Sequence, residues 1–148
     1  MTAAVSFTVH GTPAPQGSKT VGRTKAGAAF VREDNPQTEP WRNAVAAAAT
    51  AAMLDLGEDH PLGSPLRLDV TFVFPRPRSH YRTGRNAGQL KPSAPLYHDR
   101  RPDLDKLVRA VGDALTGIVA ADDAAFVQVV ARKHYGQPAA HISVELLG

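Results

Sequence analysis

Two pairs of acidic residues are the groups in this 148-residue chain that could do chemistry. Asp103 and Asp105 lie two positions apart in the stretch RPDLDKLVRAVGDALTG, where a helix is expected to begin. Asp122 and Asp123 follow in the short connection to the next expected strand. Converging carboxylates repel one another unless divalent cations lie between them, and oxygen-only ligand sets suit Mg²⁺ or Mn²⁺. A group of carboxylates that binds divalent cations beside a basic surface is typical of enzymes that cut phosphodiesters.

Each pair also has an ordinary structural explanation. Aspartate at a helix N-cap accepts backbone N–H groups, and aspartate in the first turn favours the helix dipole. Asp122 and Asp123 could simply form a solvated turn. A helix of about 14 residues is ~21 Å long, so Asp122 and Asp123 return to Asp103 and Asp105 only if the next strand runs antiparallel to the helix.

The expected helix over residues 103–117 has two distinct faces. Its apolar residues form a stripe at helical spacing that faces the core: Leu104, Leu107, Val108, Val111 and Leu115. Asp105, Arg109 and Asp113 form one polar row at i, i+4 and i+8. Asp103 and Asp105 differ by about 200° if both are helical. The two carboxylates therefore converge only if Asp103 lies outside the helix.

The positive charge is concentrated in one segment. The chain has a net charge of +3 and a pI of about 9.5, and residues 75–101 contain a single acid, Asp99. This proline-rich segment predicts a long basic loop whose cations contact DNA phosphates. The alternative interpretation is a solvated loop in which the charged side chains only maintain solubility. The candidate contacts are Arg76, Arg78, Arg82, Arg85, Arg100 and Arg101, and a second basic loop holds Lys19, Arg23 and Lys25.

The remaining pattern predicts an α/β (α+β) domain, residues 1–148, with a single mixed β-sheet and two main helices. Strands are expected at AVSFTVHG, at AAFV and at PLRLDVTFVFP, with an alanine-rich helix in NPQTEPWRNAVAAAATAAMLDLG. AFVQVVARKHYG and AHISVELLG are expected to form a hairpin that turns at GQPA. On the alanine-rich helix, Trp41 and Met53 are expected in the core or at a dimer contact.

Composition excludes several classes of protein. The chain has no cysteine, which removes disulfides, thiolate metal sites and a cysteine nucleophile and fits a reducing cytoplasm. We expect no signal peptide and no membrane span, because no basic region precedes an apolar run and no apolar stretch approaches 18 residues. GTPAPQGSK lacks P-loop spacing. The histidines show no metal-binding spacing, and only His98 lies near the acidic motif.

The combined motif resembles the RusA family of Holliday-junction resolvases from bacteria and their phages. The resemblance rests on RPDLDKL, on DALTG at the helix end and on DDAAFV at the turn into the strand. It implies a RusA-like fold and a cytoplasmic homodimer, encoded by a bacterial host or a prophage. The dimer would bind four-way DNA junctions and nick two strands with Mg²⁺ or Mn²⁺, leaving a 5′-phosphate and a 3′-hydroxyl.

The resemblance also implies roles for individual residues. Asp103, Asp105 and Asp123 would be the catalytic, metal-binding carboxylates, and Asp122 would be an additional acid. Arg109 stands where relatives often have lysine and would give electrostatic support or a phosphate contact, because it does not deprotonate. Lys106 replaces an asparagine and adds a cation near the site, within reach of DNA, and Lys133 on the following strand is a further candidate.

Two rival functions remain open at this stage. One is a branched-DNA-binding protein that has lost catalysis, which would bind junctions in EDTA and cut none with Mg²⁺ or Mn²⁺. The other is a metal-dependent enzyme acting on small phosphorylated substrates, since D-x-D motifs also hold Mg²⁺ there. Strongly salt-dependent DNA binding would distinguish the DNA-binding readings from the small-substrate reading.

Overall fold

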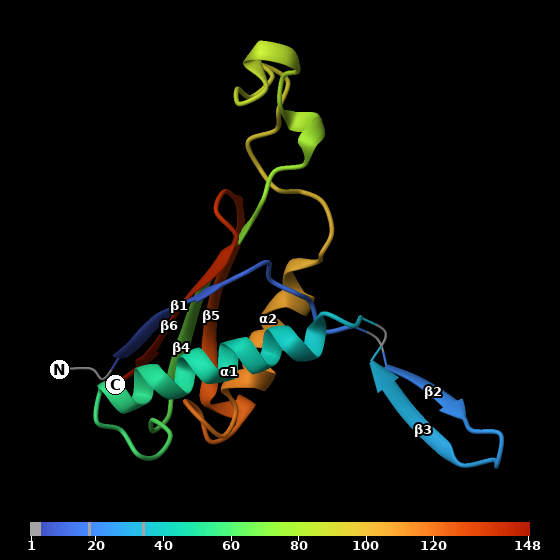
Figure 1. Ribbon diagram of the computed structural model, residues 1–148. Helices are drawn as coiled ribbons and strands as arrows, with labels where there is room; N and C mark the ends of the chain where they lie inside the picture. The colour runs from blue at the N-terminus through green and yellow to red at the C-terminus, as the bar shows by residue number, and fades with distance from the viewer. Residues whose placement is uncertain (1–3, 18, 34) are drawn as a thin grey trace.

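The structure is a computed structural model that describes residues 4–17, 19–33 and 35–148, without the side chains of residues 19–21 and 30–33. Figure 1 shows a body made of two helices and a sheet, from which two segments project. In chain order the elements are β1 (Ala4–His10), β2 (Lys19–Arg23), β3 (Ala29–Glu33), α1 (Thr38–Asp55), β4 (Leu66–Phe74), α2 (Leu104–Leu115), β5 (Phe126–Tyr135) and β6 (Ala139–Leu146).

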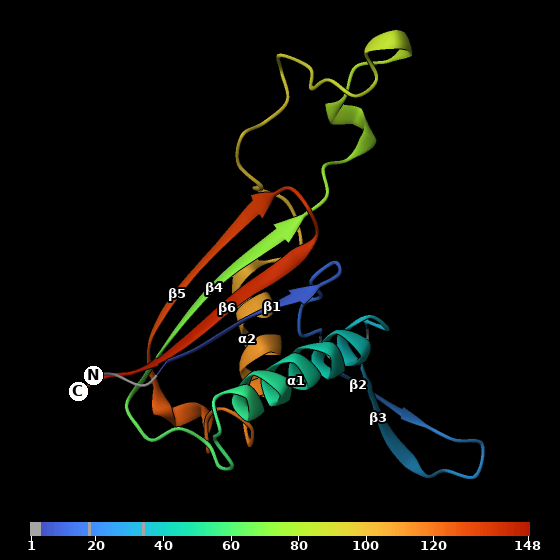
Figure 2. The ribbon, with the colours of Figure 1, turned by 60° about the vertical axis from the view of Figure 1, so that its left-hand side comes forward.

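The main sheet is mixed and has four strands in the order β1-β6-β4-β5. β4 runs antiparallel to β6 and parallel to β5. Its alternate residues from Leu66 to Phe74 are buried and the intervening ones are half-buried, which suits a central strand. Both helices cover the same face of the sheet (Figure 2). The predicted α/β class and mixed sheet are confirmed.

The predicted hairpin between the last two strands is wrong. β5 and β6 form where expected, but β4 lies between them and pairs with both. The connection at residues 136–138 crosses the end of β4, where the Gly136 amide donates to the Phe74 carbonyl at 2.8 Å. The central place of β4 buries its alternate residues, which include the largest fully buried side chains of the sheet, Phe72, Leu66 and Leu68. β5 is consequently an edge strand.

The two helices join the sheet in one core. α1 buries a stripe at four-residue spacing, Trp41, Val45, Ala49 and Met53, so Trp41 and Met53 are core residues. α2 buries Leu107, Ala110, Val111, Ala114 and Leu115, whereas Leu104 and Val108 of the predicted stripe are half-buried. Full burial along this stripe fixes α2 against the sheet and thereby fixes both of its ends.

Two projections leave the body in different directions (Figure 1). β2 and β3 pair antiparallel as a two-stranded sheet separate from the main one. Residues 75–100, hereafter the arm, rise from the end of β4 and return to α2. The arm contains two short 3-10 turns, Arg78–His80 and Gly84–Asn86, and a bridge between Tyr81 and Leu90. The predicted basic loop is therefore a folded projection.

Within the described residues, no helix is both long enough and apolar enough to cross a membrane.

Candidate nuclease site

Asp103 lies at the N-cap of α2, but its side chain does not cap the helix. Its backbone is extended, with φ −69° and ψ 138°, and its carboxylate makes no cap hydrogen bond within the described structure. The side chain is 57% exposed, and Lys106 Nζ lies 3.7 Å from its Oδ2. The extended backbone meets the condition for Asp103 and Asp105 to converge, and the exposed Asp103 carboxylate remains accessible to a ligand.

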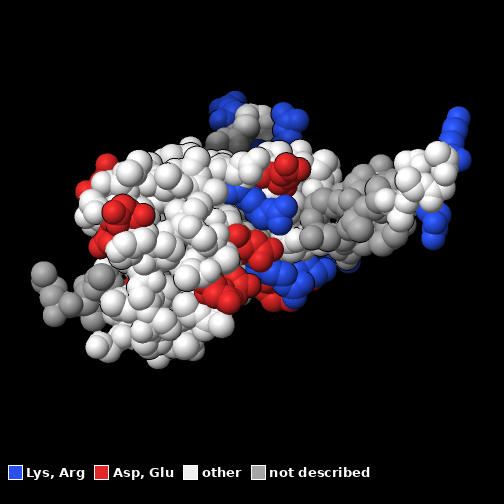
Figure 3. All heavy atoms as spheres, turned by 90° about the horizontal axis from the view of Figure 1, so that it is seen from below, with Lys and Arg blue, Asp and Glu red and all other residues white. Residues whose placement is uncertain are grey.

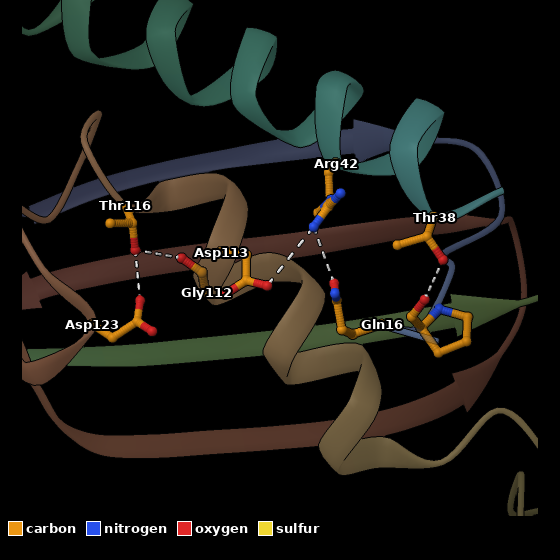
Figure 4. A network of polar contacts seen from close by, with 8 residues as sticks. Gln16, Thr38, Arg42, Gly112, Asp113, Thr116 and Asp123 are labelled. Atoms are coloured by element: carbon orange, nitrogen blue, oxygen red, sulfur yellow. Dashed lines mark hydrogen bonds and ion pairs between the residues drawn. The ribbon is translucent and has the colours of Figure 1, made fainter. Parts of the chain in front are cut away.

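The polar row of α2 is solvent-exposed as predicted. Asp105, Arg109 and Asp113 are all exposed along one side of the helix. Arg42 of α1 lies 3.9 Å from Asp113 and donates to the Gln16 side chain at 3.3 Å (Figure 4). This exposed ion pair contributes at most about 1 kcal/mol, and it ties the far part of the row to α1.

A hollow of about 340 Å³ adjoins the start of α2. Its walls come from three parts of the chain: Pro15, Asn35, Arg101, Pro102, Asp103 and Lys106. The amide of Gln16 donates to the Lys106 carbonyl at 2.9 Å, which fixes the β1–β2 loop against the first turn of the helix. Asp103 therefore faces an open recess between the roots of the arm and the β2–β3 hairpin.

Lys133 of β5 holds the chain immediately before Asp103. Its ammonium donates to the Arg100 carbonyl at 2.6 Å and to the Pro102 carbonyl at 3.0 Å. The alternation of β5 points Lys133 toward the helix side, because it pairs in register with the buried Phe72 of β4. Lys133 therefore lies close to the acidic motif, and its contacts are with the backbone that precedes Asp103.

An aromatic cluster anchors the arm to the sheet. The His98 ring stacks on Tyr135 with centroids 4.7 Å apart and tilts against Phe74 at 4.8 Å. Arg76 lies 4.5 Å from the centroid of the Tyr135 ring and donates to the Pro95 carbonyl at 2.7 Å. Burial, together with the nearby Lys133 ammonium, lowers the pKa of His98. Arg76 thus joins the two sides of the arm at its root.

The other predicted DNA-binding arginines are available at the surface. Arg78, Arg82, Arg85, Arg100 and Arg101 are exposed, and Arg100 has a 3.8 Å contact with the equally exposed Asp99. Basic side chains also mark the outer end of the β2–β3 hairpin (Figure 3), where Arg23 and Lys25 are exposed. The side chain of Lys19 lies outside the described residues. Cations therefore occur on both projections.

The second acidic pair occupies the opposite end of α2. Asp122 caps the 3-10 turn Asp123–Ala125 by accepting from the Ala124 amide at 3.1 Å. The Thr116 hydroxyl donates to Asp123 at 2.6 Å and shares its single proton with the Gly112 carbonyl, which lies 2.9 Å away (Figure 4). The two neighbouring acids thus have different partners, one in the turn and one on the helix end.

The chain does not bring Asp123 to Asp103 and Asp105. The 12 residues of α2 span about 18 Å, and Asp123 is bonded to Thr116 at the end of that length. Among the described residues, no three acidic or histidine side chains form a group that could hold a metal. β5 does run back toward the start of α2, but the residue it delivers there is Lys133.

Three contacts at the site were missed by sequence reasoning. These are the Thr116–Asp123 bond, the Arg42–Asp113 pair and the Gln16 amide on Lys106. Thr116 lies within the DALTG motif, so the motif itself was a signal. Arg42 and Gln16 come from segments far away in the sequence, and nothing in their local pattern pointed to α2.

Exposed carboxylates lie at the start of α2, and the two segments that project beside it carry exposed lysines and arginines. This combination is typical of a protein that acts on nucleic acid. Residues 10–146 match the family model of the endodeoxyribonuclease RusA. The chain belongs to the RusA family of Holliday-junction resolvases, which are crossover-junction endodeoxyribonucleases of DNA recombination and repair. No curated protein sequence matches the chain significantly.

Proposed function

We propose that this protein is a Mg²⁺-dependent endonuclease, with Mn²⁺ as an alternative ion, that resolves four-way DNA junctions as a homodimer in the bacterial cytoplasm. The observation that carries the proposal is Asp103, whose carboxylate lies at the N-cap of α2 without capping it. Asp103 lies exposed at the root of a basic arm, and its exposed ion pair with Lys106 leaves the carboxylate accessible to a ligand.

The residues at this end of α2 fit a hard divalent cation. Mg²⁺ is commonly held by one or two carboxylates together with water and substrate phosphate. Asp103 and Asp105 supply such oxygens, and the exposed helix start leaves room for a phosphate. When bound, the ion would supply Lewis-acid stabilisation and an activated water for hydrolysis of the phosphodiester.

The surrounding side chains position DNA and the acids. Lys133 fixes the carbonyls of Arg100 and Pro102 and so sets the approach of the chain to Asp103. Lys106, 3.7 Å from the Asp103 carboxylate, offers a cation to the scissile phosphate when DNA enters the recess. Arg109, one turn beyond Asp105, supplies a second positive charge that stabilises the same phosphate.

The exposed arginines of the arm suit the DNA backbone. Five arginine side chains in and next to the arm are exposed to solvent: Arg78, Arg82, Arg85, Arg100 and Arg101. Arg100 has an ion-pair contact with the equally exposed Asp99. Exposed arginines neutralise DNA phosphates and release the counterions bound there. Arg76 supports this surface by joining both sides of the arm. These positions favour a polymeric anion over a small phosphorylated substrate.

A cleavage assay on synthetic DNA tests the proposal. The wild-type protein is expected to nick a four-way junction with Mg²⁺ or Mn²⁺, to bind it without nicking in EDTA, and to leave linear duplex of the same sequence uncut. Junction binding without any cleavage in either metal would favour the inactive DNA-binding protein. Absence of salt-dependent junction binding would contradict the proposal altogether.

A further inference from the structure

We propose that Leu96 and Tyr97 of the arm, hereafter the bend, stack on a base pair at the branch point of the DNA and so select branched DNA over linear duplex. This assignment rests on the proposed function and deepens it, because it names the feature of the substrate that is recognised. Its starting point is that phosphate contacts are available on linear and branched DNA alike. The bend would add a contact that only branched DNA offers.

The two side chains of the bend are unusually accessible. Leu96 and Tyr97 are 74% and 75% exposed, which makes them the most exposed large hydrophobic side chains among the described residues. Tyr97 is also the only phenylalanine, tryptophan or tyrosine side chain in the described part of the chain that is exposed rather than buried or half-buried. Apolar surface in contact with water is unfavourable, so two such neighbours on a projection favour a partner that covers them.

The backbone of the bend is fixed on both sides. On one side, the Arg76 guanidinium donates to the Pro95 carbonyl at 2.7 Å. On the other side, the His98 ring is buried and stacks on Tyr135 with centroids 4.7 Å apart. The bend lies between these two anchors, on the limb of the arm that returns to α2 (Figure 1). Little conformational freedom is therefore left to lose when its side chains bind a partner.

The charge around the bend selects nucleic acid as that partner. The arm contains one acidic residue, Asp99, and its exposed basic side chains include Arg78, Arg85 and Lys91. The arm of a second copy would carry the same charge and repel this one. Single-stranded and unstacked nucleic acid offers both parts of a complementary surface, phosphates for the cations and base faces for the apolar side chains.

A second pair of exposed leucines shows that exposure alone does not make such a surface. Leu54 and Leu56 at the end of α1 are 70% and 52% exposed. They are surrounded in the sequence by acids, Asp55, Glu58 and Asp59, which repel DNA. The end of α1 is therefore a matched control for the bend.

The bend lies a short length of chain before the candidate metal site. Tyr97 is six residues before Asp103, so their Cα atoms are at most about 22 Å apart. Lys133 holds this connection through the Arg100 and Pro102 carbonyls. At about 3.4 Å per nucleotide, a base stacked on the bend lies within about six nucleotides of a phosphate at the start of α2. Stacking at the branch point would thus direct cleavage to its vicinity.

A branch point supplies base faces that a linear duplex lacks. Inside a linear duplex each base pair is stacked on both faces, and separating two of them has an energetic cost. Where four duplex arms meet in an open centre, the last base pair of each arm has one free face. An aromatic ring stacks on any base, so the bend would recognise the branched structure and not its sequence.

Binding in EDTA to a four-way junction and to a linear duplex tests the selection. Tyr97→Ala is expected to weaken junction binding by at least about fivefold and to leave duplex binding at the wild-type level. Tyr97→Phe keeps the ring and should bind as the wild type does. Leu96→Ala should also weaken junction binding, whereas Leu54→Ala should not. Wild-type junction affinity in Tyr97→Ala, or an equal loss on both DNAs, would overturn the inference.

Fluorescence tests the stacking itself. Trp41 is buried, so Tyr97→Trp introduces one exposed indole against a constant background. Its emission is expected to be quenched by a four-way junction in EDTA and not by linear duplex, because a base stacked on an indole quenches it. Leu54→Trp is the control and should respond to neither DNA. Emission of Tyr97→Trp that both DNAs quench alike, or that neither changes, would overturn the inference.

Failure of the inference and failure of the proposed function give different results. A wild-type protein that nicks junctions, together with a Tyr97→Ala variant that binds them equally well, removes only the stacking role. A wild-type protein without salt-dependent junction binding contradicts the proposed function and the inference with it. If Tyr97 instead contacts a second copy, Tyr97→Ala lowers the mass measured by sedimentation equilibrium without DNA, and that result would also overturn the inference.

Discussion

The two ends of α2 carry acids of the same type in different settings. At the first end Asp103 is exposed, unused as a cap and close to Lys106. At the last end Asp122 caps a turn, and Asp123 is fixed by Thr116. The difference shows that one acidic pair leaves oxygens free for a ligand, whereas the other is held in a defined place.

The cations differ between the ends in the same way. Lys133 lies at the first end, where it orients the chain before Asp103 through the Arg100 and Pro102 carbonyls, and the exposed arginines of the arm are the proposed DNA contacts. At the last end Arg42 is committed to Asp113 and Gln16. A phosphodiester bound at the first end would therefore meet exposed carboxylates and the exposed arginines of the arm.

After removal of a catalytic carboxylate, Lys133→Met is expected to have the largest effect on the rate of junction cleavage. The substitution removes two hydrogen bonds from a charged donor, each worth roughly 1.5–3 kcal/mol. It therefore frees the chain that precedes Asp103 and leaves the other end of α2 unchanged. We expect junction cleavage to fall by about tenfold or more, with little change in the dissociation constant for DNA.

Arg132→Met is the matched control for Lys133→Met. Arg132 lies one residue earlier on the opposite face of the sheet, where it contacts Asp69 and Thr71 at 3.0 and 2.8 Å. Equal losses of cleavage in both variants would show that Lys133 acts only through general stability.

Thr116→Val tests how the other end holds Asp123. The variant keeps the shape of threonine but loses a hydrogen bond to a charged acceptor, worth roughly 1.5 kcal/mol or more. Because the family resemblance implies a metal-binding role for Asp123, cleavage is expected to fall by about tenfold. Thr50→Val removes the same kind of bond to a carbonyl one turn earlier, at 2.8 Å on Ala46, with no acid involved. Cleavage rates that fall equally would contradict a role for Asp123.

Arg85→Ala tests whether the arm binds DNA beside the start of α2. One lost phosphate contact should reduce the slope of log affinity against log salt by about 0.9 for duplex arms. The measurement is junction binding across a salt series, in EDTA. Arg67→Ala, on the open face of the sheet beside Glu145, should leave the slope unchanged, and a slope that stays at the wild-type value in Arg85→Ala would remove the arm from the binding surface.

The smallest effect is a pH dependence of stability from His98. Its pKa is lowered by burial and by Lys133, while Asp99 acts in the opposite direction and His80 adds to the lowering. The unfolded chain therefore binds the proton more readily, so stability is present above the unfolded pKa of about 6.5 and is lost as pH falls.

His98→Phe keeps a ring against Tyr135 and removes the titration. Between pH 7.5 and pH 5.5 its melting temperature should fall less than that of the wild type. His60→Gln is the control, because His60 is exposed and its pKa is raised by the Pro61 carbonyl and Asp59, so its loss does not relieve acid sensitivity. An unchanged acid sensitivity in His98→Phe would contradict the assignment.

The parts of the structure that sequence could predict are the local ones. The stripe of α2 followed from 3.6-residue spacing, and the need for Asp103 to lie outside the helix followed from helix geometry. The exposed row through Asp105 and Arg109 followed from the same spacing. These features depend on residues within a few turns of one another.

The parts that sequence could not predict depend on the path of the chain. A connection of three residues between β5 and β6 resembles a hairpin turn, yet it crosses β4. The distance of Asp123 from Asp103 depends on where β5 begins relative to α2, and adjacency in a motif gives no information about that. The same holds for Lys133, which reaches Pro102 from 31 residues away.

Cleavage of a four-way junction by Asp105→Asn tests the central claim most directly, with Asp55→Asn at the exposed end of α1 as the control. Loss of several kcal/mol of charge stabilisation should lower cleavage by Asp105→Asn at least about 100-fold, while junction binding in EDTA and cleavage by Asp55→Asn remain at the wild-type level. Cleavage by Asp105→Asn at the wild-type rate would contradict the placement of the nuclease site at the start of α2.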